Sequence, residues 1–450
     1  MTVGKEWKVI LLFTLPIIAG NALQQMYNII DGIIVGNFVG EAAFAAVGTT
    51  QPIIFLHLSF AIGLSVGVGI VISQYFGAGK HDELPTAIDT ALILCGIAGV
   101  MFSVIAYSIA PFMLRTILIV PEEIFPMAIT YFRIFSLGFG FLFVYNGVAA
   151  ILRSVGDSKA TLYFLLIATV LSTILTFLFV VVLQWGVMGA AFTTVIAQAV
   201  CVVISYIYMR KRFPFVKSAK HWDREIAATM IRLGLPIAVQ MGVVAIGNTV
   251  MHRLVNGFEH TVPGIIAAFA AAMRLDMLLF APIMGFQAGL ASFVGQNVGA
   301  DRFDRVKRGF HATLIMSVAL TVVMSALFFI FARPLLLFFG LEGGMDTGVE
   351  IVRFFAMWFW LFVVYMAVNG VLQGTGDTVI QSVATLGSII MRVGLAYTAV
   401  HFGLLGYTAA WITAPISWGF ATIIVYIRYF TGGWKKKAVV KNPRAHGAPN

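Results

Sequence analysis

Charged residues are scarce in this chain of 450 residues. Lys, Arg, Asp and Glu make up 11% of it and hydrophobic residues 60%, whereas a soluble domain carries roughly 25% charged residues. With a mean hydropathy of +0.96, the composition excludes an ordinary soluble protein. The net charge of +10 does not indicate nucleic-acid binding, because the basic residues lie in short loops between apolar runs, which is a signal of membrane topology.

Cysteines and enzyme motifs are also lacking. Cys95 and Cys201 are the two cysteines, and both fall in apolar segments, so neither a disulfide framework nor a metal cluster is expected. The sequence contains no His-Glu-x-x-His, no phosphate-binding loop ending in Gly-Lys-Ser/Thr and no Gly-x-Ser-x-Gly turn. We therefore expect no enzymatic activity, no metal and no cofactor other than a coupling ion, and no use of ATP by this chain.

Long apolar segments are what the sequence does have. Segments of about 20 apolar residues predict membrane helices, and twelve are found, at residues 9–35, 50–76, 87–110, 124–148, 160–184, 187–210, 228–255, 263–294, 311–333, 348–372, 379–401 and 404–430. Basic residues gather in alternate loops and in the tail. This pattern predicts a multi-pass protein of the cytoplasmic membrane with both termini in the cytoplasm, and we expect it to act as a monomer in the lipid bilayer.

The chain repeats itself with a constant offset in numbering. Leu15-Pro16-Ile17 recurs as Leu235-Pro236-Ile237, an offset of 236 − 16 = 220, and Gly156-Asp157 recurs as Gly376-Asp377 at the same offset. Six helices per repeat is an even number, so the repeat is parallel. The predicted fold is an all-α polytopic membrane protein of twelve transmembrane helices in two six-helix lobes. The predicted parts are an N-lobe at 1–210, a linker at 211–226, a C-lobe at 227–430 and a basic tail at 431–450. The Gly-Asp pairs are interpreted as turns.

A carboxylate lies inside the first apolar segment. Asp31 is the last of a stripe of polar residues, whose other members are Asn21, Gln24, Gln25 and Asn28. Their three- and four-residue spacing places most of them on one helix face. An ionisable residue within the membrane indicates a functional site. Asp31 binds a proton or a sodium ion in this interpretation; the alternative is a permanent ion pair, although no Lys or Arg lies in the same half of the helix.

The second repeat is chemically different. Met251 is the repeat equivalent of Asp31, and Asn248 and His252 beside it form a second polar stripe. His252 either titrates or is a hydrogen-bonded histidine. Arg274 and Asp276 lie in the eighth segment, where a spacing of two places them on different sides of the helix. These four polar residues are secondary candidates.

Four motifs are distinctive in combination. They are Gln-Gln-Met-Tyr-Asn-Ile-Ile-Asp-Gly-Ile-Ile-Val-Gly at 24–36, Val-Gly-Gln-Asn-Val-Gly-Ala at 294–300, Leu-Arg-Ser-Val-Gly-Asp at 152–157 and Leu-Gln-Gly-Thr-Gly-Asp at 372–377. Together they resemble the multidrug and toxic compound extrusion (MATE) family, in its DinF-like prokaryotic branch. The resemblance covers the chain to about residue 430. It implies a V-shaped pair of six-helix lobes that exports cationic and amphipathic drugs in exchange for H⁺ or Na⁺.

The resemblance also implies roles for particular residues. Asp31 matches the coupling aspartate of helix one, and Pro16 matches the proline at which that helix bends. Where the family often has an Asn and an Asp in helix five, this chain has Ser172 and Thr176, and Asn146 of helix four is the candidate to supply an amide. The other expected cavity-lining residues are Gln24, Met26, Tyr27, Asn28 and Tyr145.

Three alternatives remain to proton-coupled drug export. The sodium-linked branch carries a Glu in helix seven and an Asp in helix ten, which this chain lacks inside those helices, so protons are favoured. A lipid or lipid-linked sugar flippase of the same superfamily is the second alternative, against which the acidic Asp31 argues. A membrane-embedded enzyme would need a second catalytic group beside Asp31, and that helix supplies only amides and Tyr27.

Overall fold

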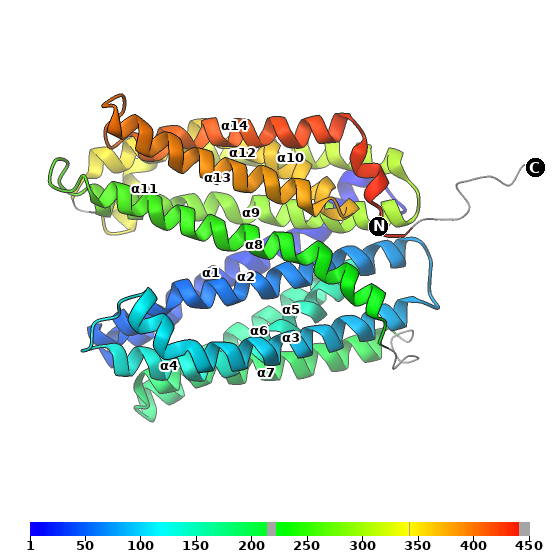
Figure 1. Cartoon of the computed structure of the whole chain (residues 1–450), viewed down its shortest axis with the longest axis horizontal. Coiled ribbons are helices and arrows are strands. Elements are labelled where there is room, and N and C mark those ends of the chain that lie inside the picture. Colours follow the sequence, from blue (N-terminus) through cyan, green and yellow to red (C-terminus); the bar gives the residue numbers. More distant parts are fainter. Residues whose placement is uncertain (214–221, 342, 441–450) are drawn as a thin grey trace, which may run out of the picture. The chain divides into compact units, whose positions relative to one another are not determined.

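The computed structural model describes residues 1–213, 222–341 and 343–440, without the side chains of 27–33 and 35. Helices account for nearly all of this part of the chain (Figure 1). Within it, eleven helices are long and apolar enough to cross a membrane, or twelve when a bent pair counts as one span. A bilayer requires each backbone polar group to be satisfied within its own segment. The prediction of an all-α protein with twelve transmembrane helices is confirmed.

The helices follow one another in two series. The first series is α1 (Glu6–Val39), α2 (Glu41–Gly77), α3 (Leu84–Phe112), α4 (Phe125–Leu137), α5 (Phe139–Ser154), α6 (Ser158–Thr176) and α7 (Gly186–Arg212). The second is α8 (Arg224–Asn256), α9 (Ile265–Gly299), α10 (Phe303–Ile330), α11 (Ala332–Phe338), α12 (Met345–Thr375), α13 (Thr378–His401) and α14 (Ala409–Phe430). Several helices extend beyond the predicted segments because hydropathy detects only the apolar middle of a helix that continues into polar surroundings.

One predicted helix is bent. The segment expected at 124–148 consists of α4 and α5, which meet at Gly138 with an angle of 45° between them. The chain does not leave the helical region there, because the amide of Gly138 still donates to the carbonyl of Phe135 at 2.9 Å. The pair is one broken span, which completes the set of twelve.

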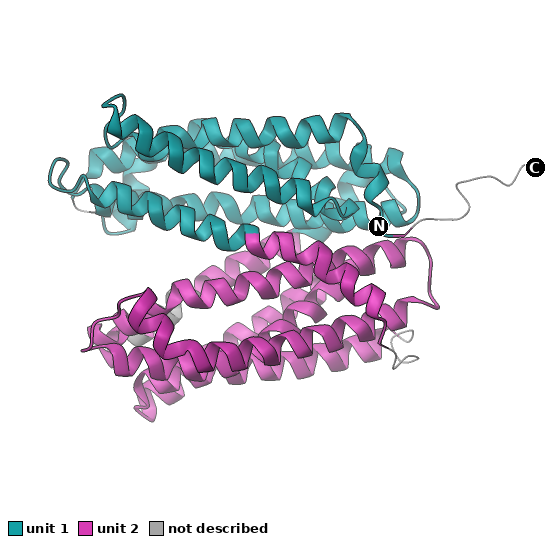
Figure 2. Ribbon diagram, in the orientation of Figure 1, with its two compact units in different colours: residues 1–14, 240–439 teal, residues 15–239, 440–450 magenta. Residues whose placement is uncertain are grey.

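Two compact units divide the chain, as Figure 2 shows. Unit 1 comprises residues 1–14 and 240–439, and unit 2 comprises 15–239 and 440–450. The chain changes unit between residues 14 and 15, inside α1, and between residues 239 and 240, inside α8. α1 therefore begins in unit 1 and ends in unit 2, and α8 begins in unit 2 and ends in unit 1. The predicted lobes at 1–210 and 227–430 divide the chain by the order of its helices. The packing units differ from them at the first helix of each half: the start of α1 belongs to the unit of the second half, and the start of α8 belongs to the unit of the first half.

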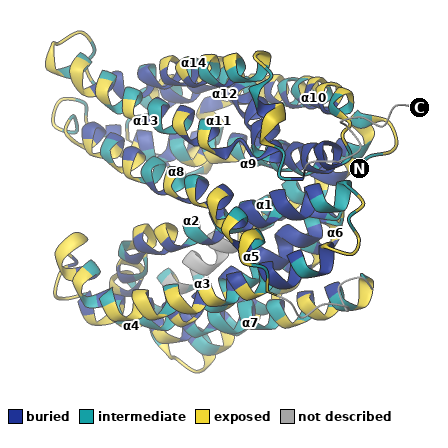
Figure 3. Cartoon of the chain, turned by 45° about the vertical axis from the view of Figure 1, so that its right-hand side comes forward, coloured by how far each residue is buried: buried dark blue, intermediate teal, exposed yellow. Residues whose placement is uncertain are grey.

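Close helix approaches fix these exchanged segments within each unit. A Cβ added at Gly289 of α9 would collide with Thr14 of α1, and one added at Gly67 of α2 would collide with the carbonyl of Met230 in α8. Only a glycine permits such an approach of two helices. Each leading helix is thus held at its start by a glycine of the unit that receives it. Figure 3 shows buried and exposed residues side by side on most of the helices.

The first residues of the chain are held by unit 1. The Met1 ammonium donates to Oε1 of Gln296 at 2.6 Å, and Arg305 donates to the carbonyl of Met1 at 3.3 Å. Burial, together with the charge of Arg305, lowers the pKa of the Met1 ammonium. Glu6, at the start of α1, pairs with Arg305 at 3.3 Å and with Arg308 at 2.9 Å. These contacts anchor the beginning of α1 to α9 and α10.

The two Gly-Asp pairs are turns, as predicted. Gly156 and Gly376 have φ of 97° and 91°, a left-handed conformation that favours glycine. Each following aspartate is bonded to the last long helix of its half: Asp157 accepts from the Tyr208 hydroxyl at 2.8 Å, and Asp377 pairs with Arg428 at 2.6 Å. Tyr208 and Arg428 are themselves equivalent positions of the repeat, so the repeat keeps the contact and changes its chemistry.

We expect Asp377→Asn to destabilise the protein more than Asp157→Asn does. The first substitution should cost about 2–3 kcal/mol, less than a fully buried broken pair, because Arg428 is 26% exposed. The second removes a bond to a neutral hydroxyl and should cost about 1 kcal/mol. Thermal unfolding of the purified variants in detergent measures both. Equal losses would show that the ion pair and the tyrosine bond are equivalent.

Candidate functional site

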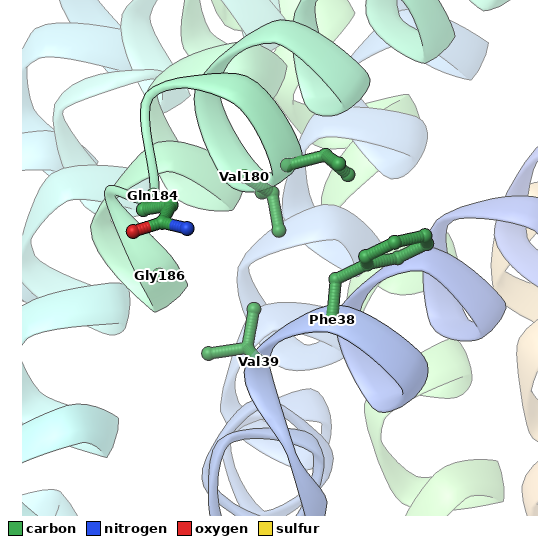
Figure 4. Close-up of a pocket in the computed structure, with 6 residues that line it drawn as sticks. Phe38, Val39, Val180, Gln184 and Gly186 are labelled. Carbon is green, nitrogen blue, oxygen red and sulfur yellow. The ribbon is translucent and has the colours of Figure 1, made fainter.

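The part of α1 beyond residue 15 runs alongside α6 in unit 2. Near the start of the pair, a Cβ at Gly20 would lie 3.4 Å from Cδ2 of Leu165 in α6. At its far end, Phe38 and Val39 of α1 line a pocket of about 280 Å³ together with Val180, Val181, Gln184 and Gly186 (Figure 4). Residue numbers increase in the same direction along both helices, so the two segments are parallel.

These two contacts bracket the expected coupling position. Residue 31 lies in the helix between Gly20 and Val39, and Ser172 and Thr176 lie between Leu165 and Val180 on the other side. Because both helices rise by roughly 1.5 Å per residue, position 31 of α1 falls beside the stretch 172–176. Ser172 and Thr176 are buried, at 4% and 0% exposure. The side chains of Asp31, Tyr27 and Asn28 lie outside the described residues, so their roles stay predictions.

The other cavity-lining candidates are placed separately along α1 and α5. Gln24 and Met26 are exposed on α1, where the exposed surface includes whatever faces lipid. Tyr145 and Asn146 are half-buried on α5, and the Asn146 amide donates to the carbonyl of Leu142 in its own helix at 2.8 Å. This bond ties Asn146 to its own helix. Its predicted part in the site stays a prediction.

The hinge candidate and the division between units nearly coincide. Pro16 lies within α1, two residues after Thr14, where unit 1 gives way to unit 2. Pro236 lies within α8, shortly before the reverse change at Gln240. Each proline removes one helical hydrogen bond and permits a bend. The place of Pro16 fits a hinge, and its role in transport stays a prediction.

In unit 1, the secondary candidates separate into two groups. Arg274 and Asn248 are exposed, whereas Asp276 is half-buried, which agrees with the prediction that Arg274 and Asp276 face different sides of α9. Asp276 interacts electrostatically with Arg392 of α13. His252 of α8 interacts with the same guanidinium, and its ring meets Phe269 edge-on at 5.0 Å. Among the described residues, no three His, Cys, Asp or Glu side chains are arranged to hold a metal ion.

Sequence reasoning missed the partners of the charged residues. Arg392, Tyr208 and Arg428 were not predicted to interact with any of the candidate residues. The repeat contains the missing signal, because Arg392 is the repeat equivalent of Ser172, and Arg428 is that of Tyr208. The repeat therefore relates these partners to residues of the first half whose chemistry differs.

The register between α1 and α6 can be tested by cross-linking. We expect the pair Gly20→Cys and Leu165→Cys to form a link readily with a short bifunctional thiol reagent, since these positions are in contact. Gly36→Cys with Leu165→Cys is the matched control, because residue 36 is about 24 Å farther along α1. The native Cys95 and Cys201 are buried and give little background. Equal linking of both pairs would overturn the register.

Comparison with known proteins gives the same repeat. A family model described as MatE matches residues 16–178 and again 236–398. The chain is 29% identical over 440 residues to the probable multidrug resistance protein YpnP of Bacillus subtilis, covering 96% of this chain and 97% of that protein. It is 25% identical to a protein named FAD transporter from Shewanella oneidensis, over 73% of each chain.

A solved structure agrees with the fold. The crystal structure described as MATE in the straight conformation matches with a TM-score of 0.88 and 25% identity, covering 96% of this chain and 98% of that one. Two matches of the family model in one chain confirm that the repeat in the sequence reflects two related halves.

Proposed function

This chain belongs to the MATE family of multidrug efflux transporters, and we propose that it exports cationic, amphipathic compounds in exchange for protons that bind Asp31. The observation that carries this proposal is the position of residue 31. It is the carboxylate of a polar stripe in the sequence of α1. Counting from the contacts at Gly20 and Val39, we infer that it is level with the buried residues Ser172 and Thr176 of α6. Hydroxyl groups can hydrogen-bond either form of a carboxyl group.

Competition between the proton and the substrate supplies the coupling. Deprotonated Asp31 attracts a cation into unit 2, and a proton on the same carboxylate removes that attraction. Because Asp31 belongs to a mostly apolar segment of the sequence, a bare charge is costly there, and either ligand relieves that cost. Each ligand favours the conformation in which it binds better, which links the two fluxes without ATP.

The direction of the cycle follows from topology. Lys and Arg concentrate in the loops on the side of both termini, which we assign to the cytoplasm of the cell membrane. Asp31 lies far along α1, which begins at Glu6, after a rise of roughly 37 Å, so it belongs to the half of the membrane that faces outward. Protons arriving from outside then reach Asp31 and displace the substrate to that side.

Transport by purified protein in liposomes tests the proposal. A cationic fluorescent dye is the substrate, and a proton gradient or a sodium gradient is imposed in separate experiments. We expect uphill dye transport with the proton gradient alone, and Asp31→Asn should reduce it roughly 5- to 150-fold, the effect of losing a coupling free energy of about 1–3 kcal/mol.

The matched control is Asn37→Gln, which lengthens an exposed amide on the same helix and keeps Asp31 in place. It should transport the dye nearly as well as the parent protein. Two results would contradict the proposal: Asp31→Asn transporting like the parent under the proton gradient, or transport that responds to sodium alone.

A second candidate function is the export of an anionic nucleotide-like compound. The relative named FAD transporter and the cationic Arg392 inside unit 1 favour it. The same liposomes loaded with FAD in place of the dye distinguish the two, because a site whose charge is Asp31 should reject an anion. A flippase of the same superfamily is addressed by adding labelled lipid to these vesicles, where we expect no transfer above that of empty vesicles.

A further inference from the structure

Three ionisable side chains from three helices act on one another inside unit 1. Asp276 of α9 interacts with Arg392 of α13, and Arg392 in turn acts on His252 of α8. The positions are far apart in sequence, so the fold brings them together. The drug and proton exchange at Asp31 of unit 2 does not use any of them.

The bonding of this cluster is incomplete. Oδ1 of Asp276 and Nε of Arg392 are buried atoms that have no hydrogen-bond partner among the described residues. Arg392 donates to the carbonyl of Ala410 at 3.3 Å, which is a long bond. The pair Asp377 and Arg428 in the same unit is closed, by contrast, at 2.6 Å. A carboxylate with an unfilled acceptor in a membrane interior is costly, and such groups mark proton or ion pathways.

Two residues of this cluster lie at or beside positions that the repeat relates to the candidate site of unit 2. Arg392 is the repeat equivalent of Ser172, and His252 follows Met251, which is the repeat equivalent of Asp31. Unit 1 therefore carries ionisable groups on α8 and α13 at or beside the positions that correspond to Asp31 and Ser172 of unit 2. The carboxylate of unit 1, Asp276, comes from α9, whereas the position equivalent to Asp31 in α8 is Met251.

We propose that Asp276 is a second proton-binding carboxylate of the transport cycle, and that Arg392 is the cation that acts on it. The inference rests on the proton antiport proposed above. Binding of one proton converts the carboxylate to a neutral acid and leaves the guanidinium charge uncompensated. The interior of unit 1 becomes more positive by one charge, which disfavours a cationic substrate there in the same way as protonation of Asp31 does in unit 2.

The groups around Asp276 leave Arg392 as the charge that acts on it. On its own helix, Arg274 is exposed. Besides α8 and α13, which supply His252 and Arg392, the helices α10, α11 and α12 pack against α9. The charged or titratable residues of these three lie toward the helix starts, namely Asp304, Arg305, Lys307, Arg308 and His311, then Arg333, then Asp346, Glu350 and Arg353. Tyr365, farther along α12, is bonded to Thr385 of α13.

The number of protons exchanged per drug molecule tests the proposal. In liposomes, the membrane potential at which dye flux stops is measured at several pH gradients, and its dependence on the gradient gives the stoichiometry. We expect Asp276→Asn to lower the stoichiometry by one proton per dye while Asp31 is intact. Arg274→Gln is the matched control, since it removes an exposed charge on the same helix, and it should leave the value unchanged.

A second measurement does not require transport. Dye is added to the purified protein in detergent with a pH indicator, and the protons released per bound dye are counted. Asp276→Asn should release one proton fewer than the parent, whereas Asp276→Glu, which keeps the carboxylate, should release the parent number. Arg392→Lys keeps the positive charge and should change the pH at which release occurs more than the number of protons released.

The outcomes separate this inference from the proposed function. If Asp276→Asn keeps the parental stoichiometry and proton release while Asp31→Asn loses coupling, the second site is wrong and the antiport proposal stands. If His252→Gln lowers the proton count and Asp276→Asn does not, the proton binds histidine and the inference fails. If neither Asp31→Asn nor Asp276→Asn changes the stoichiometry, both proposals fail.

Discussion

Two helices of this protein have residues in both packing units. α1 begins in unit 1 and ends in unit 2, and α8 does the reverse. A helix in a bilayer satisfies its backbone polar groups within its own segment, so each of these two helices is one continuous element whose two parts belong to different units. Pro16 and Pro236 lie beside the two crossing points, where one hydrogen bond is already missing.

Anchoring at the start of α1 decides which part of that helix can move. Glu6 is paired with two arginines of α10, and Thr14 is fitted against Gly289 of α9. The segment before Pro16 is therefore fixed in unit 1. Beyond Pro16, α1 contacts α6 at Gly20 and lines a pocket with the segment after α6 near Val39, so a change in charge at residue 31 acts beyond the proline, in unit 2.

The fold was predictable from the sequence to the extent that it follows from hydrophobic length and from the repeat. Twelve spans follow from apolar segments, and the turns at Gly156 and Gly376 follow from the need for a left-handed residue. The bend between α4 and α5 at Gly138 was not predicted, because glycine is also common in straight membrane helices. The exchange of half-helices was equally invisible, since hydropathy carries no information on which neighbour a helix contacts.

The candidate site was predictable only in part, for a related reason. A carboxylate in an apolar helix is visible as an anomaly at Asp31, but its level beside Ser172 and Thr176 depends on the register of α1 against α6. Arg392 shows the same limit: its charge was evident, and its interaction with Asp276 is a property of the packing inside unit 1. Ionisable groups can thus be found by composition, whereas their partners require the fold.

The two acids also differ in what compensates their charge. Asp31 has no basic residue in its half of α1, whereas Asp276 interacts with the guanidinium of Arg392. In the transport cycle that we propose, a proton on either acid makes the unit that holds it less favourable for a cationic substrate.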